Sequence, residues 1–173
     1  SLLTGRYATT DRQKNNDAFF CPEARKPGLP PSFPAHFRNN GYQTVAIGKI
    51  SHYPGGLGGV NWNDPRKVEM PGAWDTNLMP TESVWKHPQG AMHGYAGGVP
   101  RGKYHPVREH NEGDDLTYTD GWITREALQQ MKGLAAADKP FFLAVGLMKP
   151  HLPFACPESY IDLYKDATLP AIP

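Results

Sequence analysis

Twice in this sequence, a segment with helical spacing is followed at once by a short apolar run. Residues 32–40 place aromatic side chains four positions apart, and Gly41 follows where a helix commonly ends. The β-branched run 44–48 comes next and has the composition of a buried strand. The same order recurs in residues 120–137 and 141–147. Helix then strand, repeated, predicts an α/β fold in which helices flank a mostly parallel central sheet.

The second predicted helix has one apolar face. That face is formed by Ile123, Ala127, Met131, Leu134 and Ala135. Asp120 or Thr119 is placed to cap the start of the helix. Asp114 and Asp115 stand just before it, where acidic residues favour a helix N-terminus. Clustered carboxylate oxygens also suit a hard cation, but we favour the capping interpretation.

Both predicted strands end in a lysine followed closely by a histidine. Lys49 and His52 follow the first strand, and Lys149 and His151 follow the second. Ligands of open α/β sheets bind beyond the carboxyl ends of the strands. A lysine supplies a fixed positive charge and a histidine titrates near neutral pH, so we expect the two pairs to converge on one anion. The alternative, a solvated lysine and a hydrogen-bonding histidine at each strand end, stays open from the sequence alone.

Residues 53–115 form a long, loop-rich excursion between the two helix–strand units. Their periodicity is weak, and loops of this length usually border a site. Four histidines in this excursion lack metal-ligand spacing, and loop polarity explains them: His87, His93, His105 and His110. Four aromatic residues either border a sugar pocket or pack the loop itself: Trp62, Trp74, Trp85 and Tyr95.

Composition argues against two classes of partner. The formal net charge is +1 and like charges do not cluster, so neither nucleic acid nor a membrane surface is an expected partner. No apolar run approaches the roughly 18 residues that a bilayer span needs. The two cysteines, Cys21 and Cys156, are far apart in sequence and do not make a disulfide framework.

Three motifs resemble the sulfatase family. Residues 1–6, Ser-Leu-Leu-Thr-Gly-Arg, resemble the second half of the sulfatase signature Cys-x-Pro-Ser-Arg-x-Ser-Leu-Leu-Thr-Gly-Arg. Residues 40–49 resemble the family's helix end and following strand, and the Lys-x-x-His spacing that comes next is that of the iduronate-2-sulfatase group. Residues 140–154 are close to the same group. The resemblance implies an alkaline-phosphatase-like sandwich, with residues 1–173 as part of its N-terminal catalytic domain.

The resemblance also implies a mechanism. The nucleophile would be a formylglycine made from a cysteine upstream of Ser1, and the Ca²⁺ ligands would lie outside this chain, so the chain alone is expected to be inactive. Lys49 would hold the formylglycine hydrate and a sulfate oxygen, and His52 would accept a proton from that hydrate. His151 would face the bridging oxygen and assist the departing alcohol, while Lys149 would add positive potential where substrate binds.

The resemblance implies hydrolysis of sulfate esters on a sulfated small molecule, sugar or glycosaminoglycan. It also suggests a periplasmic, secreted or lysosomal setting, which the residues themselves do not indicate. Cys21 precedes Arg25 at the signature's spacing, but the residues between them differ, so we do not expect Cys21 to be the nucleophile. Three alternatives stay open. They are another alkaline-phosphatase-like hydrolase, such as a choline- or aryl-sulfatase or a phosphodiesterase; a non-catalytic domain that binds sulfated glycans; and a plain structural α/β domain.

Overall fold

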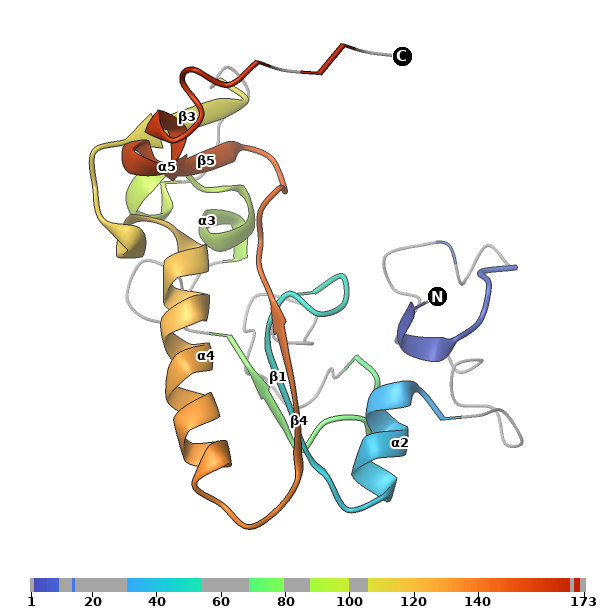
Figure 1. Cartoon of the computed structure of the whole chain (residues 1–173). Helices are drawn as coiled ribbons and strands as arrows, with labels where there is room; N and C mark the ends of the chain where they lie inside the picture. Colours follow the sequence, from blue (N-terminus) through green and yellow to red (C-terminus); the bar gives the residue numbers. More distant parts are fainter. Residues whose placement is uncertain are drawn as a thin grey trace.

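In the part of the chain that the structure, a computed structural model, describes, three parallel strands form a sheet that joins the two predicted helix–strand units (Figure 1). Its strands are β1 (Gln43–Gly48), β2 (Thr76–Leu78) and β4 (Phe141–Gly146), in the order β2-β1-β4. β1 pairs with β4 over its full length, so that Gly48 stands opposite Gly146. The predicted parallel sheet is confirmed, and β1 and β4 present their carboxyl ends at one edge.

The structure describes residues 2–9, 14, 31–53, 69–79, 88–99, 106–168 and 170–171. Several residues singled out in the sequence lie outside this set: Ser1, Cys21, Trp62, Trp85, His87 and His105. Within residues 53–115, the described parts include β2, a helix, a 3-10 turn and a further strand. These are α3 (Pro88–His93), η6 (Ala96–Gly98) and β3 (Arg108–Asn111).

The first predicted helix is α2 (Phe33–Asn39), which packs on one face of the sheet (Figure 1). Ser32 caps its start, where the serine hydroxyl accepts a backbone hydrogen bond at 3.4 Å. Gly41 follows the helix with φ of +87°, a conformation that suits glycine after a helix end. The ring of Phe37 stacks on that of Phe142 in β4, with centroids 4.8 Å apart. The predicted helix, turn and strand are confirmed.

The second predicted helix is α4 (Thr119–Ala135), which lies against the opposite face of the sheet (Figure 1). Three residues of its predicted apolar face are buried in the hydrophobic core: Ile123, Ala127 and Leu134. The other two residues of this face are exposed in the structure: Met131, at 43%, and Ala135. A sheet of three described strands covers a narrower stripe of the helix than the predicted face.

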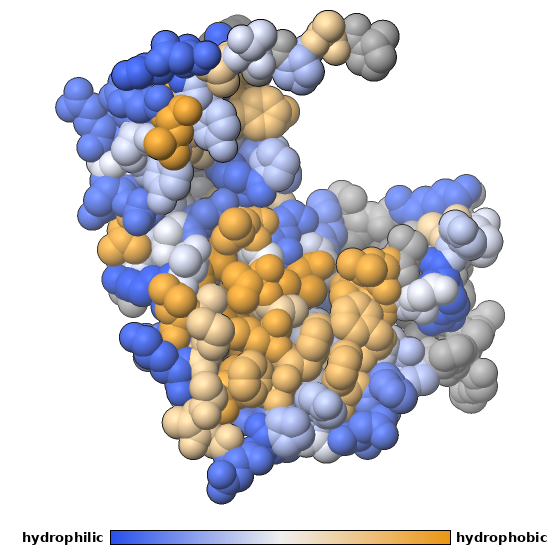
Figure 2. All heavy atoms as spheres, in the orientation of Figure 1, coloured by the Kyte–Doolittle hydropathy of each residue, from blue (hydrophilic) through white to orange (hydrophobic). Residues whose placement is uncertain are grey.

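β4 is less buried than its sequence indicated. The apolar run predicted a strand covered on both faces, yet its residues are only partly covered and Val145 is 45% exposed. β1, which lies between two neighbours, is buried from Thr44 to Gly48. Among the described strands β4 has a neighbour on one side only. Figure 2 shows hydrophobic side chains gathered in the middle of this view, where β4 runs.

The loop after β4 leads into a second sheet, which has two strands among the described residues. Here β3 pairs in parallel with β5 (Phe154–Pro157), and the short helix α5 (Glu158–Asp162) comes directly after β5. One 3-10 turn, η7 (Asp115–Thr117), leads from β3 into α4, and another, η1 (Leu2–Thr4), lies near the N-terminus. None of the described helices is long and apolar enough to cross a membrane.

Candidate active site

The carboxyl ends of β1 and β4 meet at a pair of glycines. The amide of Lys49 donates to the carbonyl oxygen of Gly146 at 2.7 Å. Gly48 has φ of +76°, and a Cβ there would come closer than 3.0 Å to that same oxygen. A Cβ on Gly146 would meet the carbonyl oxygen of Lys49 just as closely. The two glycines therefore allow the two lysine-bearing loops to start side by side.

The ammonium group of Lys49 turns back onto its own loop. Its Nζ donates to the carbonyl oxygens of Ser51 at 3.1 Å and His52 at 2.8 Å. An ammonium group has three N–H donors, so one is left for an anion as far as the described residues go. Burial lowers the pKa of Lys49, and the negative charge of Glu69 works against that shift. The ring of His52 packs edge-on against Tyr53, with centroids 4.9 Å apart.

Glu69 is a buried carboxylate in contact with this loop, and no sequence pattern pointed to it. The residue is 1% exposed. Its Oε2 accepts one hydrogen bond from the Ser51 hydroxyl and another from the Tyr53 amide, at 3.2 Å. Burial raises the pKa of Glu69 to about 7, although these hydrogen bonds and the charge of Lys49 oppose the shift.

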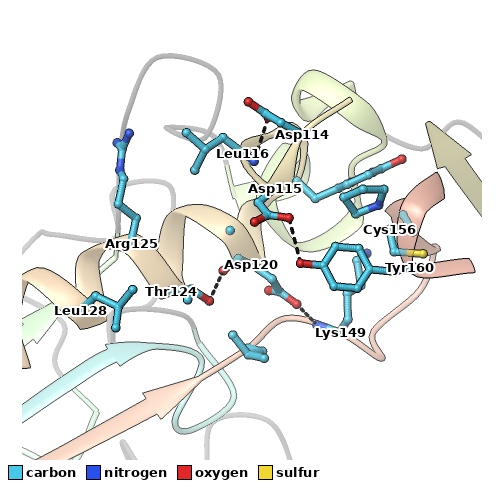
Figure 3. A pocket seen from close by; sticks show the side chains of 15 residues that line it. Asp114, Asp115, Leu116, Asp120, Thr124, Arg125, Leu128, Lys149, Cys156 and Tyr160 are labelled. Atoms are coloured by element: carbon cyan, nitrogen blue, oxygen red, sulfur yellow. Dashed lines mark hydrogen bonds between the residues drawn. The ribbon is translucent and has the colours of Figure 1, made fainter. Parts of the chain in front are cut away.

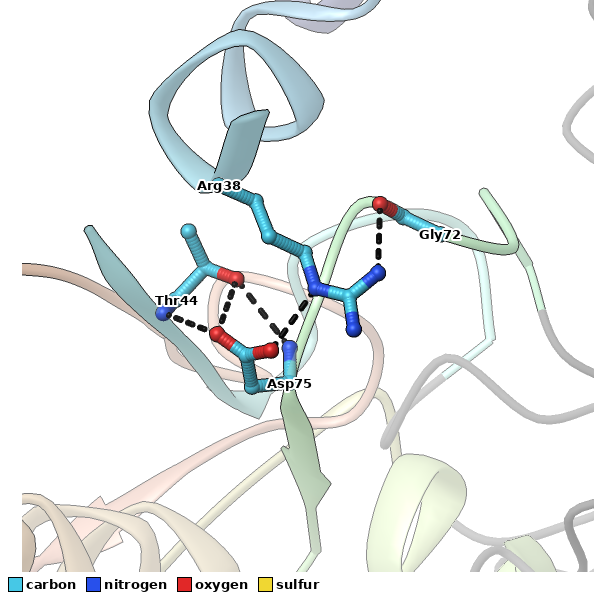
Figure 4. Close-up of polar contacts among 4 residues, drawn as sticks. All are labelled: Arg38, Thr44, Gly72 and Asp75. Atoms are coloured by element: carbon cyan, nitrogen blue, oxygen red, sulfur yellow. Dashed lines mark hydrogen bonds and ion pairs between the residues drawn. The ribbon is translucent and has the colours of Figure 1, made fainter. Parts of the chain in front are cut away.

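The segment that carries Glu69 is tied to α2 and β1 through Asp75 (Figure 4). The Oδ2 atom of Asp75 accepts from the amide of Thr44 at 2.9 Å and from its hydroxyl at 3.2 Å. The Oδ1 atom accepts from Arg38 Nε at 2.7 Å, and Arg38 also donates to the carbonyl oxygen of Gly72 at 3.3 Å. Burial alone would raise the pKa of Asp75, but these hydrogen bonds outweigh it and lower the pKa.

Lys149 repeats the arrangement of Lys49 on the neighbouring loop. Its Nζ donates to the carbonyl oxygens of His151 at 3.3 Å and Pro153 at 2.5 Å. Acceptors among the described residues thereby use two of its three N–H donors. Burial lowers the pKa of Lys149, while the charges of Asp120 and Glu109 work against that shift.

Asp120 does not cap α4, so the prediction for it was wrong. The residue at the cap position is Tyr118, whose side chain makes no capping bond. Thr119 does not cap the helix either, because its hydroxyl donates to a carbonyl oxygen of α3 at 3.0 Å. The Asp120 carboxylate instead accepts from the amides of Met148 at 2.7 Å and Lys149 at 3.1 Å. These amides follow β4 and need an acceptor away from water, so Asp120 fixes the start of the loop.

His151 lies beside a second histidine that the sequence did not connect with it. The rings of His151 and His93 approach edge-on, with centroids 4.6 Å apart. His151 Nδ1 lies 2.9 Å from the carbonyl oxygen of Leu152. Because a carbonyl oxygen can only accept, this contact assigns a proton to Nδ1 and leaves Nε2 as the nitrogen that can gain or lose one.

Asp114 and Asp115 make local polar contacts. Asp114 caps the 3-10 turn η7, by accepting from the amide of Leu116 at 2.9 Å, and does not cap α4 as the sequence predicted. Asp115 accepts from the Tyr160 hydroxyl at 2.8 Å. Across the described ranges, no group of three or more His, Cys, Asp or Glu residues is placed to hold a metal ion. We therefore assign no Ca²⁺ ligand to these parts of the chain.

A cavity of about 640 Å³ opens beside Lys149, between α4, β5 and α5 (Figure 3). Asp120, Lys149 and Tyr160 are among its polar lining residues, although its wall is more apolar than polar. Cys156 also lines it, and burial raises the pKa of this thiol. A raised pKa is the behaviour of an unactivated thiol and not of a nucleophile.

Strand pairing thus brings the two lysine-bearing loops to one edge of the sheet. Each loop carries a half-buried lysine with one N–H to spare and a histidine two or three residues later. His110 lies elsewhere, on β3, with its Nδ1 atom 3.7 Å from Glu158 Oε1. The catalytic roles expected for Lys49, His52 and His151, and the substrate-binding role expected for Lys149, stay predictions.

The family model and the known proteins that match this chain are all described as sulfatases. The sequence model of the family described as Sulfatase matches residues 1–171. The chain is 28% identical to the iduronate 2-sulfatase of Homo sapiens over 171 residues and to that of Mus musculus over 165 residues. Each of these matches covers 95% of this chain and 28% of the relative's length. An arylsulfatase of Clostridium perfringens (strain 13 / Type A) is 37% identical over 57 residues, 33% of this chain and 12% of that protein.

Proposed function

Because the chain belongs to the sulfatase family, we propose that the loops after β1 and β4 form part of an active site that hydrolyses sulfate esters. The observation that supports this most is the pairing of the two strand ends, where the Lys49 amide donates to Gly146. It puts two half-buried lysines at one edge of the sheet. A sulfate ester carries a negative charge, and partly buried ammonium groups attract an anion more strongly than groups in bulk water do.

The four loop residues would divide binding and proton transfer between them. Lys49 would bind a sulfate oxygen through its remaining N–H, as a fixed positive charge. His52 would accept a proton at the nucleophile's side of the substrate. His151 holds its Nδ1 proton against the Leu152 carbonyl oxygen, so its Nε2 would pass a proton to the departing alcohol. Lys149 would add positive potential.

Family membership also implies a formylglycine nucleophile and a Ca²⁺ ion. When present, they supply an attacking oxygen and offset the charge of the sulfate group. The described residues offer neither a metal-binding group nor an activated thiol. We therefore assign only binding and proton transfer to this part of the chain, and the activity of the whole protein is part of the proposal.

We propose a sulfated sugar as the substrate class. The two relatives matched over 95% of the chain are both iduronate 2-sulfatases. A histidine at the leaving oxygen also suits a sugar alcohol, which leaves poorly unless it is protonated. An aryl or choline sulfate ester is the competing substrate, and the 57-residue match to an arylsulfatase keeps the aryl ester in the test.

The experiment is a turnover assay of the complete gene product on three esters: a 2-sulfated uronic acid, p-nitrophenyl sulfate and a phosphodiester. We expect the sulfated sugar to be hydrolysed with the highest kcat/KM. His151→Ala should lower kcat/KM on the sulfated sugar by roughly 10²- to 10⁴-fold, the usual contribution of a positioned proton donor. The loss should be smaller on p-nitrophenyl sulfate, because nitrophenolate leaves without a proton.

His110→Ala is the matched control, since this histidine is exposed on β3. It should keep wild-type turnover on every ester. Equal losses of His151→Ala on the sugar and the nitrophenyl ester would refute leaving-group assistance. Turnover of the phosphodiester alone would refute the sulfatase assignment of the activity.

A further inference from the structure

One carboxylate oxygen bonds the two residues on either side of His52. Glu69 Oε2 accepts from the hydroxyl of Ser51 and from the amide of Tyr53. The backbone amide of His52 also faces this carboxylate, since it helps to lower the pKa of Glu69. Three consecutive residues of the loop therefore depend on a side chain that is 16 to 18 positions away in sequence.

Holding a carboxylate in this place is costly to folding. Glu69 is 1% exposed, and its Oε1 has no hydrogen-bond partner among the described residues. A buried polar atom without a partner normally costs about 1–3 kcal/mol and calls for an explanation. Anchoring the segment does not provide one, because Asp75 already ties that segment to α2 and β1.

The charge of Glu69 acts on Lys49 as well. Burial works against the charged form of Lys49, and Glu69 is the group that opposes this effect. Lys49 can hold an anion only while it is an ammonium group. The same carboxylate therefore shapes the loop and supports the charge that the loop presents.

We propose that Glu69 is a positioning residue for sulfate turnover, holding the Lys49–His52 loop through Ser51 and Tyr53 and keeping Lys49 charged. The inference rests on the proposed function of this loop. Glu69 acts through Lys49 and His52 and is assigned no contact with substrate. Among the described residues, three with titratable side chains face it: Lys49, whose charge acts on it, and His52 and Tyr53, whose backbone amides bond to it.

The test compares Glu69→Gln with the wild type in the complete gene product. Gln keeps the shape and one acceptor oxygen but removes the charge. We expect kcat to fall roughly 10- to 100-fold, as loss of charge-assisted hydrogen bonds predicts. The alkaline limb of the kcat/KM profile should also move to lower pH, because Lys49 loses the charge that favours its protonation.

Two further variants separate the two effects. Ser51→Ala removes one hydrogen bond but no charge, so it should lower kcat and leave the alkaline limb in place. Ser51→Ala also tests the positioning role if the Glu69→Gln protein does not fold. Glu112→Gln makes the same substitution at an exposed position and should match the wild type. An unmoved alkaline limb in Glu69→Gln, or wild-type kcat in Ser51→Ala, would overturn the inference while the proposed function stands.

If the wild type hydrolyses no sulfate ester, the proposed function fails. The effect of Glu69 on Lys49 can then still be tested by measuring the pKa of Lys49. Its reactivity towards acetic anhydride, followed against pH by mass spectrometry, reports its pKa directly. The inference requires that pKa to be lower in Glu69→Gln than in the wild type. An equal pKa in the two proteins would overturn it.

Discussion

Gly48→Ala is the substitution that most sharply tests how the two loops are brought together. A Cβ at Gly48 would come closer than 3.0 Å to the carbonyl oxygen of Gly146 and would also crowd Ile123 in α4 at 3.0 Å. Backbone, and not a flexible side-chain tip, is the closest obstacle, so the strand ends must separate. The backbone at Gly48 also has φ of +76°, which an alanine adopts only at a cost.

The magnitude follows from these two effects. A left-handed conformation costs a non-glycine residue about 1–2 kcal/mol, and forcing an extra methyl group into packed structure costs about 1–3 kcal/mol. Together they predict that Gly48→Ala lowers the free energy of unfolding by roughly 2–5 kcal/mol. Turnover should fall as well, because Lys49 is the next residue and its amide bonds to Gly146.

The assay is urea unfolding of the complete gene product, with sulfate-ester turnover measured on the same samples. Gly133→Ala is the control, because a Cβ at this exposed position in α4 meets nothing within 4 Å. Alanine there should raise stability by about 0.5–1 kcal/mol through its better helix propensity. A Gly48→Ala protein as stable and active as the Gly133→Ala protein would show that the glycine pair does not govern the strand ends.

Two further substitutions test the carboxylates of Asp120 and Glu69. Asp120→Asn should lower the free energy of unfolding by about 1–3 kcal/mol, since the single oxygen of a side-chain amide cannot accept from the backbone amides of both Met148 and Lys149. The control is Asp114→Asn, which should change stability little because asparagine serves equally well at this exposed cap. Equal losses of stability in the two variants would contradict the role of Asp120. The pKa of Glu69 is about 7 in the folded protein against an ordinary value of 4.5. Between these two pH values, folded Glu69 keeps a proton that unfolded Glu69 has lost. Stability should therefore fall by about 3 kcal/mol as pH rises through this window. Glu69→Gln should lack that loss in urea titrations, and identical pH dependence in the two proteins would contradict the burial of the charge.

Local signals in the sequence were sufficient for the two helix–strand units. Phe33 and Phe37 mark one face of α2, and Gly41 supplies the positive φ that ends it. Both features act within a few residues, so they can be read without knowing the fold. The shared edge of β1 and β4 followed from the same pattern, because strands joined through helices pair in parallel.

The groups that fix the loops could not be read in this way. Glu69 and Ser51 are 18 positions apart in sequence. The rings of His93 and His151 come together only in the tertiary structure, so no local sequence pattern predicts their contact. Asp120 was misread for a related reason. Its position alone favours a cap at the start of the helix. In the tertiary structure, its carboxylate instead accepts hydrogen bonds from the backbone amides of Met148 and Lys149, which are 28 and 29 positions away in sequence.

The most direct measurement is a crystal structure of the complete gene product with its sulfate product bound. A single sulfate ion should lie with its oxygens at about 3 Å, hydrogen-bonding distance, from both Lys49 Nζ and the ring of His151, with His52 at the same pocket. A sulfate held elsewhere, with Lys49 and His151 facing separate surfaces, would contradict the proposed active site.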